Sequence, residues 1–208
     1  MQKLLQQISA GDHVAFFYRS RQEQFSFVIP FVADGLKRNQ RCLYIAHDNS
    51  IPMVLQKMKE AGIPVAKATG SGQLKIATKK DTYLRHGVFQ AEKMVEHLAE
   101  EVRISEREGY AAFRGTAEMT WALDTPAALE SLAEYECRLH AQFPGKFVGL
   151  CQYDETRFSE STISDMIRIH PWVIARGRLM RNRQTVHDHR SLGAEPVMSV
   201  DELTRLCA

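Results

Sequence analysis

Short apolar runs alternate along this chain with longer segments in which apolar residues recur at helical spacing. Apolar runs of this length, bounded by Gly, Pro and polar residues, are typical of buried strands. We therefore predict strands at residues 14–18, 42–46, 73–78, 110–113, 147–151, 172–175 and 178–180. The alternation of strands and helices predicts an α/β fold with three layers, in which helices flank a mainly parallel sheet.

The segments between these runs have apolar positions with the period of a helix. Pro30 interrupts the first of them, so that helix must either kink or start afresh there. Asp124-Thr125-Pro126 supplies a cap and a first turn for one helix that runs through Leu139. We predict helices across residues 25–36, 54–61, 88–102, 129–139 and 159–169, and a short final helix that begins with a capping box at 199–202.

A chain of 208 residues with 44% hydrophobic composition can bury a substantial core, and its length favours one domain. The sequence contains neither an internal repeat nor a recognisable interdomain linker. We place the domain at residues 1–180. The segment 181–208 is polar and rich in His and Arg through Arg190, and we predict a loosely attached tail that ends in the short helix.

The charge balance gives no ground for a nucleic-acid or membrane partner. Lys and Arg number 27 against 25 Asp and Glu, which leaves a net charge of +2. No segment reaches the roughly 20 apolar residues of a membrane span. Four cysteines without a C-x-x-C pair fit free thiols in a reducing compartment, so we expect a cytoplasmic protein. Arginines near the C-terminal end lack a recognition helix for DNA, namely Arg176, Arg178, Arg181, Arg183 and Arg190.

Motifs for known catalytic chemistry are missing from the sequence. A nucleotide hydrolase of this fold needs a Gly-rich phosphate loop after its first strand, and the glycine-free segment 18–23 occupies that place. There is no G-x-S-x-G, no H-E-x-x-H and no Cys/His group at zinc-ligand spacing. His187-Asp188-His189 lies in the polar tail, where nothing nearby completes a coordination shell. We expect neither an enzyme nor a cofactor or metal site.

Polar and aromatic side chains follow several of the predicted strands. Ligands of parallel α/β sheets bind outside the carboxyl ends of the strands, so we expect these side chains to converge on a largely apolar ligand pocket. Two of them have ordinary alternatives, since Trp121 could belong to the core and His47 could only begin a helix. The candidate ligand-binding residues are Tyr18, His47, Arg114, Glu118, Trp121, Glu136, Cys151, Tyr153 and Asp154.

Structural roles are also open for other candidates. Arg114 could form a simple ion pair with Glu118. In the helix predicted at 129–139, the apolar stripe of Leu129, Leu132, Tyr135 and Leu139 places Glu136 at the edge of the buried face. A carboxylate at that place needs a partner, and Arg114 is one candidate. Cys151 lies inside an apolar run and could be an inert packing thiol.

A family resemblance rests on blocks that occur in this order: GDHVAFFY (11–18), RCLYI (41–45), EMTWAL (118–123), EYE (134–136), LCQYD (150–154) and HPWVI (170–174). Together they resemble the MEDS domain, the methanogen/methylotroph sensory domain named for a dichloromethane-responsive regulator. The resemblance covers about residues 8–180.

This resemblance implies a RecA-like or KaiC-like α/β core that has lost its phosphate-binding loop and senses small hydrocarbon derivatives. Such domains are often joined to histidine kinases or DNA-binding modules, which implies a regulatory output. Carried over by position, the resemblance singles out His13, Tyr18, Glu118, Trp121, Glu136, Tyr153 and Asp154.

Three classes of function follow from these observations. The first is a non-catalytic sensory or regulatory domain that binds a small organic ligand, such as a one-carbon or hydrocarbon derivative. It would signal through a regulatory protein partner, such as a kinase or a transcription factor, or through self-association as a homodimer. The second is a protein-interaction scaffold that uses a degenerate nucleotide-binding fold without a small ligand. The third is an enzyme with Glu118, Asp154 or Cys151 as acid, base or nucleophile.

Overall fold

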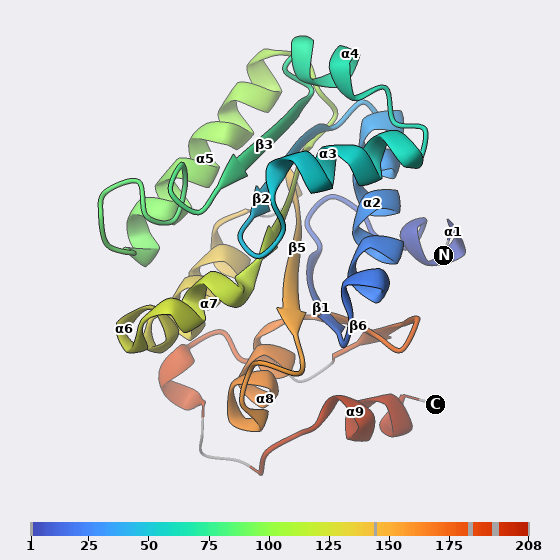
Figure 1. Ribbon diagram of the computed structural model, residues 1–208. Coiled ribbons are helices and arrows are strands. Elements are labelled where there is room, and N and C mark those ends of the chain that lie inside the picture. Colours follow the sequence, from blue (N-terminus) through green and yellow to red (C-terminus); the bar gives the residue numbers. More distant parts are fainter. Residues whose placement is uncertain (1, 144, 183–184, 193–195, 208) are drawn as a thin grey trace.

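Seven strands form one sheet in the computed structural model, which describes residues 2–143, 145–182, 185–192 and 196–207 (Figure 1). The spatial order is β3-β2-β4-β5-β1-β6-β7. Strands β1 to β6 pair in parallel, and β7 is antiparallel to β6. The bounds are β1 (His13–Tyr18), β2 (Arg41–Ala46), β3 (Leu74–Thr78), β4 (Phe113–Glu118), β5 (Phe147–Asp154), β6 (Trp172–Ala175) and β7 (Arg178–Arg181).

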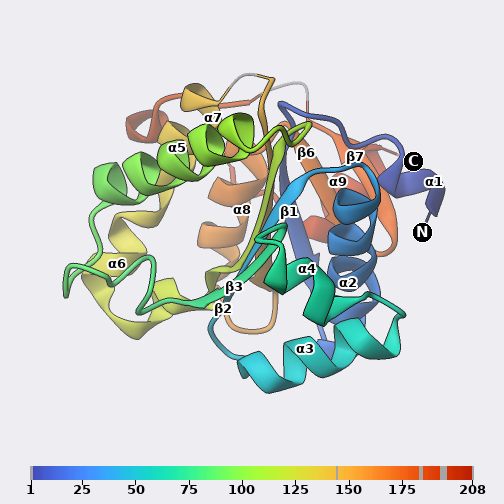
Figure 2. The ribbon, with the colours of Figure 1, turned by 90° about the horizontal axis from the view of Figure 1, so that it is seen from above.

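Helices cover both faces of this sheet, with α2, α3 and α4 on one face and α5, α7 and α8 on the other (Figure 2). Each face has its own hydrophobic cluster, so the predicted three-layer α/β fold is confirmed. The helices are α1 (Gln2–Leu5), α2 (Arg21–Lys37), α3 (Ile51–Glu60), α4 (Val65–Gly70), α5 (Ala91–Arg107), α6 (Pro126–Glu130), α7 (Leu132–Gln142), α8 (Glu160–Ile169) and α9 (Val200–Leu206), with 3-10 turns η1 (Met119–Asp124) and η2 (His189–Ser191).

The strands β4 and β5 extend further toward the carboxyl edge than the sequence predicts. We expected them to end at residues 113 and 151, but β4 begins at Phe113 and β5 continues to Asp154. Polar residues lie inside both strands because they find buried partners there. Gln152 donates to the Thr116 hydroxyl over 2.8 Å, and that hydroxyl donates to the Leu150 carbonyl. A polar residue in a two-sided sheet therefore does not mark the end of a strand.

Two helix predictions also differ from the structure. Of the two alternatives for Pro30, a fresh start is wrong: α2 is continuous through Pro30, where the buried stripe of Val28, Phe31 and Val32 holds the helix against the sheet. The expected single helix across 129–139 is divided at Ser131 into α6 and α7. Glu136 of α7 lies fully in the core, whereas we predicted it at the edge of the buried face.

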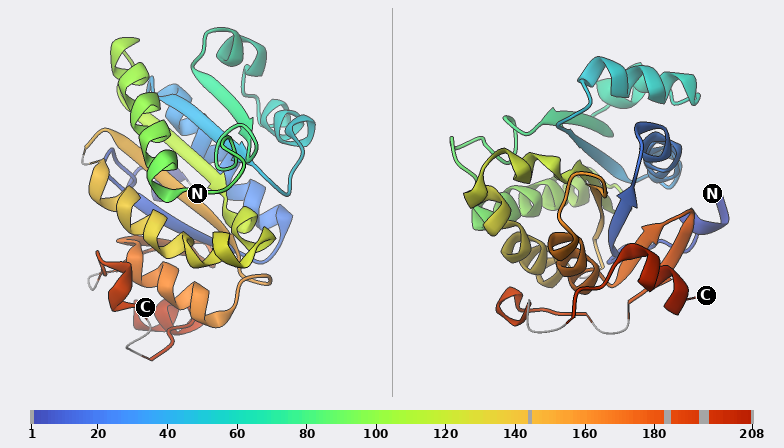
Figure 3. Two further views of the ribbon diagram at one scale, coloured as in Figure 1. Left: turned by 90° about the vertical axis from the view of Figure 1, so that its left-hand side faces the viewer. Right: turned by 60° about the horizontal axis from the view of Figure 1, so that its bottom comes forward.

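The predicted final helix is present as α9, and it packs against the rest of the chain beside the β6–β7 hairpin (Figure 3). Val200 and Leu203 are buried, and Asp201 forms an ion pair with Arg176 over 2.9 Å. The expectation of a loose attachment is therefore wrong for α9. Among the described residues, no helix combines the length and the apolar character that a membrane span needs.

Candidate functional site

Glu118 ends β4 at the carboxyl edge of the sheet, where it is completely buried and saturated with hydrogen bonds. One carboxylate oxygen accepts three backbone N–H groups, from His47 at 2.9 Å, Asp48 at 2.7 Å and Asn49 at 3.0 Å. The other accepts the Tyr44 hydroxyl at 2.7 Å and the Asn49 amide at 2.8 Å. Glu118 therefore holds the β2–α3 loop in place, and the alternative in which it pairs with Arg114 does not occur.

Residues that follow β1 occupy the position of a phosphate loop and use it to cap α2. The Ser20 hydroxyl accepts the Glu23 N–H at 3.2 Å, while the Glu23 carboxylate accepts the Arg19 N–H at 2.8 Å. This is a capping arrangement in which the polar groups bind one another. Tyr18 lies behind it, and burial together with the charge of Asp154 raises its pKa far above the ordinary value.

His47 and Asp154 lie at the same edge without meeting. The His47 ring lies 3.5 Å from Asp124, and burial together with the charge of Lys79 lowers its pKa. Asp154 turns back onto its own loop and accepts the Thr156 hydroxyl at 2.7 Å. These two candidates therefore do not converge on one pocket, because His47 faces Asp124 of η1 and Asp154 faces its own loop.

Arg114 lies at the opposite end of β4 and faces α2. Its guanidinium donates to Gln40 at 2.5 Å and to the Phe31 carbonyl at 3.2 Å, and it lies 3.3 Å from Asp34. Burial lowers its pKa to about 10. Arg114 is separated from the other candidates because β4 runs on for four more residues after it, so it partners neither Glu118 nor Glu136.

Trp121 forms the inner wall of a pocket at the carboxyl ends of β3 and β4. Its ring stacks on Tyr83 at 4.2 Å between centroids and contacts Phe89 at 4.4 Å. The pocket has a volume of about 210 Å³ and is mostly apolar. Its walls also include Leu84, Gly87, Val88, Asp124, Thr125, Ala127, Ala128 and Ser131. Trp121 thus belongs to the core and lines a pocket at the same time.

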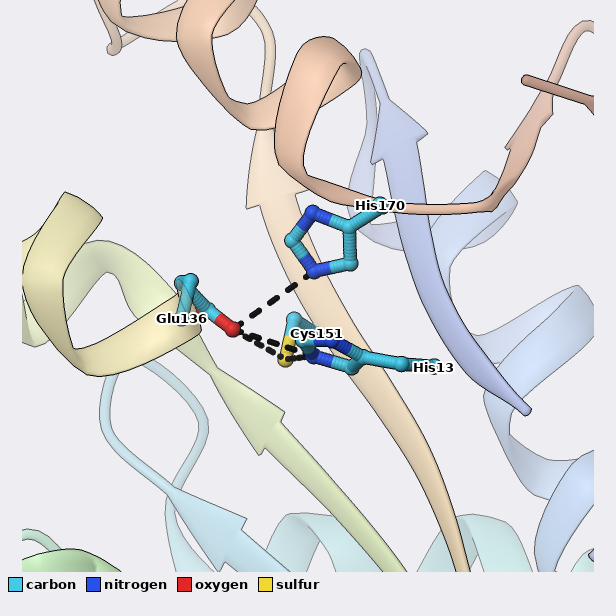
Figure 4. A group of neighbouring side chains, drawn as sticks. All are labelled: His13, Glu136, Cys151 and His170. Carbon is cyan, nitrogen blue, oxygen red and sulfur yellow. Dashed lines mark hydrogen bonds and ion pairs between the residues drawn. The ribbon is translucent and has the colours of Figure 1, made fainter. Parts of the chain in front are cut away.

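A buried polar cluster unites His13, Glu136, Cys151 and His170 between the sheet and helices α7 and α8 (Figure 4). One Glu136 carboxylate oxygen lies 3.0 Å from His13 Nε2, 3.4 Å from Cys151 Sγ and 3.5 Å from His170 Nε2. His13 Nε2 also lies 3.4 Å from Cys151 Sγ. All four side chains are at most 4% exposed. Tyr153 completes the arrangement by donating its hydroxyl to the other Glu136 oxygen at 2.6 Å.

The cluster changes the ionisation of its members in opposite directions. Burial alone disfavours the charged form of Glu136, but the hydrogen bonds from His13 and His170 outweigh burial and hold the pKa of Glu136 well below its ordinary value. Burial and the nearby Glu136 charge raise the pKa of the Cys151 thiol and of the Tyr153 hydroxyl. Cys151 is therefore a protonated thiol in this arrangement rather than a reactive thiolate.

Sequence reasoning named three members of the cluster as separate candidates and missed His170 and the grouping. Short Cys/His spacings cannot reveal residues brought together by sheet topology, because β1 pairs with β5 and His170 follows α8. A local signal existed in Gly149, which lies beside His13 in the neighbouring strand. A Cβ at Gly149 would lie 3.2 Å from the His13 ring and 2.8 Å from Phe147.

A small apolar void lies between this cluster and the pocket at Trp121. It has a volume of about 20 Å³, close to what a single water occupies. Its lining includes Cys151 and Tyr83, together with Tyr135 and the glycines Gly115 and Gly149. Another pocket of about 290 Å³, beside α2 and α4, lies at the amino end of β3, where ligands of such sheets seldom bind.

The C-terminal arginines are largely engaged within the fold. Arg176 pairs with Glu155 at 2.7 Å, Arg178 donates to the Cys207 carbonyl at 2.9 Å, and Arg181 lies over the Trp172 ring. Arg190 pairs at 2.9 Å with Asp188, which is the middle residue of the His187-Asp188-His189 motif. Arg183 lies outside the described residues.

Comparisons with known proteins identify a family and a relative of this chain. The family model described as MEDS, MEthanogen/methylotroph, DcmR Sensory domain, matches residues 12–171. The transcriptional repressor DcmR of Methylorubrum extorquens is 27% identical over 165 residues, which cover 78% of this chain and 59% of the repressor. The chain thus matches little more than half of that relative's length.

Solved structures with the same fold come from Pyrococcus horikoshii. The uncharacterized protein PH0321, solved in complex with an unknown peptide, has a TM-score of 0.62 and 13% identity over 87% of each chain. The KaiC-like protein PH0186 has a TM-score of 0.58 and 13% identity, covering 86% of this chain and 83% of its own. At this identity the likeness concerns the fold.

Proposed function

The chain belongs to the MEDS family of sensory domains, and from that premise we propose that it binds a small, largely apolar organic molecule against Trp121 and passes the binding event to a regulatory partner. One observation carries the proposal. A mostly apolar pocket of about 210 Å³ lies at the carboxyl ends of β3 and β4, where ligands of parallel sheets bind. Drug-sized ligands occupy pockets of roughly 300 Å³ or more, so this volume suits a smaller molecule, such as a one-carbon or hydrocarbon derivative.

The pocket walls combine aromatic area with a few polar groups. Phe89 and Trp121 offer ring faces, and Asp124 and Ser131 offer oxygen atoms that can orient a polar substituent. Val88, at the rim, is 65% exposed although it is a large apolar residue. Folding of the 84–89 loop over a ligand would cover this side chain, which favours the ligand-bound conformation.

A route from this pocket to the rest of the carboxyl edge passes through Asp124. This carboxylate forms an ion pair with Lys79 and lies 3.5 Å from His47, whose backbone is held by Glu118. A ligand that moved Asp124 would therefore alter the β2–α3 loop. The DcmR relationship supports a transcriptional regulator as the recipient of the signal, reached through a separate protein, a further segment or a second copy of this chain.

Thermal-shift measurements with small alcohols, halomethanes and amines test the proposal. We expect at least one of them to raise the melting temperature of the wild-type chain. Ala127→Leu would fill the pocket from the exposed side of α6 and should abolish that shift. Ala66→Leu, on the exposed surface of α4 and away from the pocket, is the matched control. An equal shift in wild type and Ala127→Leu would exclude this pocket.

The second candidate function is an interaction scaffold without a small ligand. Its support is the peptide bound to the similarly folded PH0321, whose likeness to this chain concerns the fold alone. Light scattering with and without the pocket ligand separates the two functions. A scaffold would assemble independently of any small molecule, while a sensor would change its assembly or partner affinity on binding.

A further inference from the structure

From the geometry of the buried cluster we propose that His13, Glu136, Cys151 and His170 together bind one divalent transition-metal ion of the zinc class. The four side chains come from β1, α7, β5 and the residue after α8, and they point toward a common centre (Figure 4). Their donor atoms all lie within 4.8 Å of one another. Two imidazoles, one thiolate and one carboxylate are ligand types that zinc takes in proteins.

The spacing of the donor atoms fits a tetrahedral shell. Zinc bonds of about 2.0–2.3 Å at tetrahedral angles place neighbouring ligand atoms roughly 3.3–3.6 Å apart. The Glu136 oxygen lies 3.4 Å from Cys151 Sγ and 3.5 Å from His170 Nε2. His13 Nε2 lies 3.4 Å from the sulfur and 3.0 Å from the same oxygen. The remaining donor pairs lie within 4.8 Å of one another, so metal binding would draw the four ligands closer together.

Neighbouring groups already orient two of the ligands. His170 Nδ1 lies 2.7 Å from the Met166 carbonyl oxygen, which can only accept, so Nδ1 carries the proton. On metal binding, His170 would release to solvent the Nε2 proton that it directs at Glu136, and the neutral tautomer that remains turns the Nε2 lone pair toward the centre. Tyr153 holds one Glu136 oxygen at 2.6 Å and leaves the other facing the histidines. These are the outer hydrogen bonds by which proteins fix metal ligands.

Charge supports the same conclusion. Glu136 and His170 are 0% exposed, and a buried carboxylate needs compensation. Among the described residues, the groups in contact with the Glu136 carboxylate are imidazoles, a thiol and a phenol. A divalent ion would offset the Glu136 and Cys151 charges together. On binding, the Cys151 thiol would release its proton to solvent and form a sulfur–metal bond.

The site would be structural rather than catalytic. Four protein ligands fill a tetrahedral shell and leave no open position for a substrate. The ion would tie α7 and the α8–β6 connection to the centre of the sheet. Because the ligands are buried, the ion would enter during folding, so an apo sample must be refolded before it is loaded.

Metal analysis of the purified 208-residue chain is the first test. Elemental mass spectrometry should find about one transition-metal ion per chain. The chain is then unfolded with chelator and reductant and refolded with Co²⁺, which should give the visible absorption of four-coordinate cobalt and a sulfur-to-cobalt charge-transfer band. Cys151→Ser should lose the charge-transfer band. Cys42→Ser, which removes a buried thiol on the other face of the sheet, should keep it.

A variant that preserves the core provides a second measurement. Tyr153→Phe removes only the hydroxyl that orients Glu136, and it should weaken metal affinity by about 10- to 100-fold in competition with a chelating dye. A wild-type chain that is folded by circular dichroism, holds substoichiometric metal and gives no cobalt spectrum after refolding would overturn the proposal. The cluster would then be a hydrogen-bonded network only. That result would leave the pocket at Trp121 unaffected.

Discussion

The side chain of Arg114 passes over Gly35 so closely that a Cβ on residue 35 would lie 2.5 Å from Arg114 Cδ. This contact joins α2 to β4 and explains how a charged residue is accommodated inside the sheet. Gly35 leaves the space that the arginine stem fills, while Gln40 and Asp34 bind its head. The pair fixes α2 against β4 more closely than side-chain packing on both elements would allow.

Gly35→Ala should therefore destabilise the protein. The added methyl group would overlap buried Arg114, and we expect a loss of about 1–3 kcal/mol in the free energy of unfolding measured with urea. Gly70→Ala is the control, because a Cβ there would meet nothing within 4 Å beyond its chain neighbours and the backbone of its own helix. Equal stability of Gly35→Ala and wild type would show that α2 can shift without cost.

The role of Glu118 as an acceptor for the β2–α3 loop can be tested with Glu118→Gln. The amide keeps the size of the side chain but presents N–H₂ to donors at one end, so at least one buried hydrogen bond is lost. We expect a loss of about 1–3 kcal/mol in urea unfolding. Glu130→Gln, at an exposed position in α6, should change stability little. If Glu118→Gln were as stable as Glu130→Gln, the hydrogen bonds that Glu118 accepts would not contribute to stability.

The buried ion pairs of Glu101 should make stability depend on pH in the acid range. Burial disfavours the Glu101 carboxylate, but hydrogen bonds from Lys75 and Arg41 outweigh burial and lower its pKa below the ordinary 4.5. A lowered folded-state pKa adds stability above the unfolded pKa, and this stability is lost as pH falls through the folded value. The stability difference between wild type and Glu101→Gln should thus shrink below about pH 4.5. A constant difference down to pH 2–3 would contradict the pairing.

Ser20 should matter for the stability of α2. Ser20→Ala removes the cap on the Glu23 N–H and should cost about 0.5–2 kcal/mol. Ser20→Asp restores an acceptor and should recover most of that loss. Urea unfolding of the three proteins provides the comparison. Ala and Asp variants of equal stability would mean that the Ser20 hydroxyl does not contribute as a cap.

The sequence was sufficient for the layers and for the strands with uninterrupted apolar runs, such as β1 and β2. It placed the ends of β4 and β5 wrongly, because Arg114 and Gln152 resemble loop residues until their distant partners are known. Helix caps were predictable, since Ser199 and its acceptor role depend on neighbours in the chain. Local patterns were informative wherever the deciding contact was local.

The candidate residues show the same division. Tyr18, Glu118 and Trp121 lie near the carboxyl edge of the sheet as expected, because the order of strands and polar residues along the chain predicts them there. The grouping of His13 with His170 depends on β1 lying between β5 and β6, which no spacing along the chain encodes. Sheet order decides which side chains meet, and it is fixed by long-range packing.

The void beside Tyr83 leaves room for this ring to move inside the core. Close-packed cores resist small displacements, but a ring with empty space on one side can tilt at little cost in lost contacts. Tyr83 touches Trp121 through its face and borders the same void as Cys151. A change in the tilt of the Tyr83 ring would therefore alter both its stacking on Trp121 and the space that Cys151 lines.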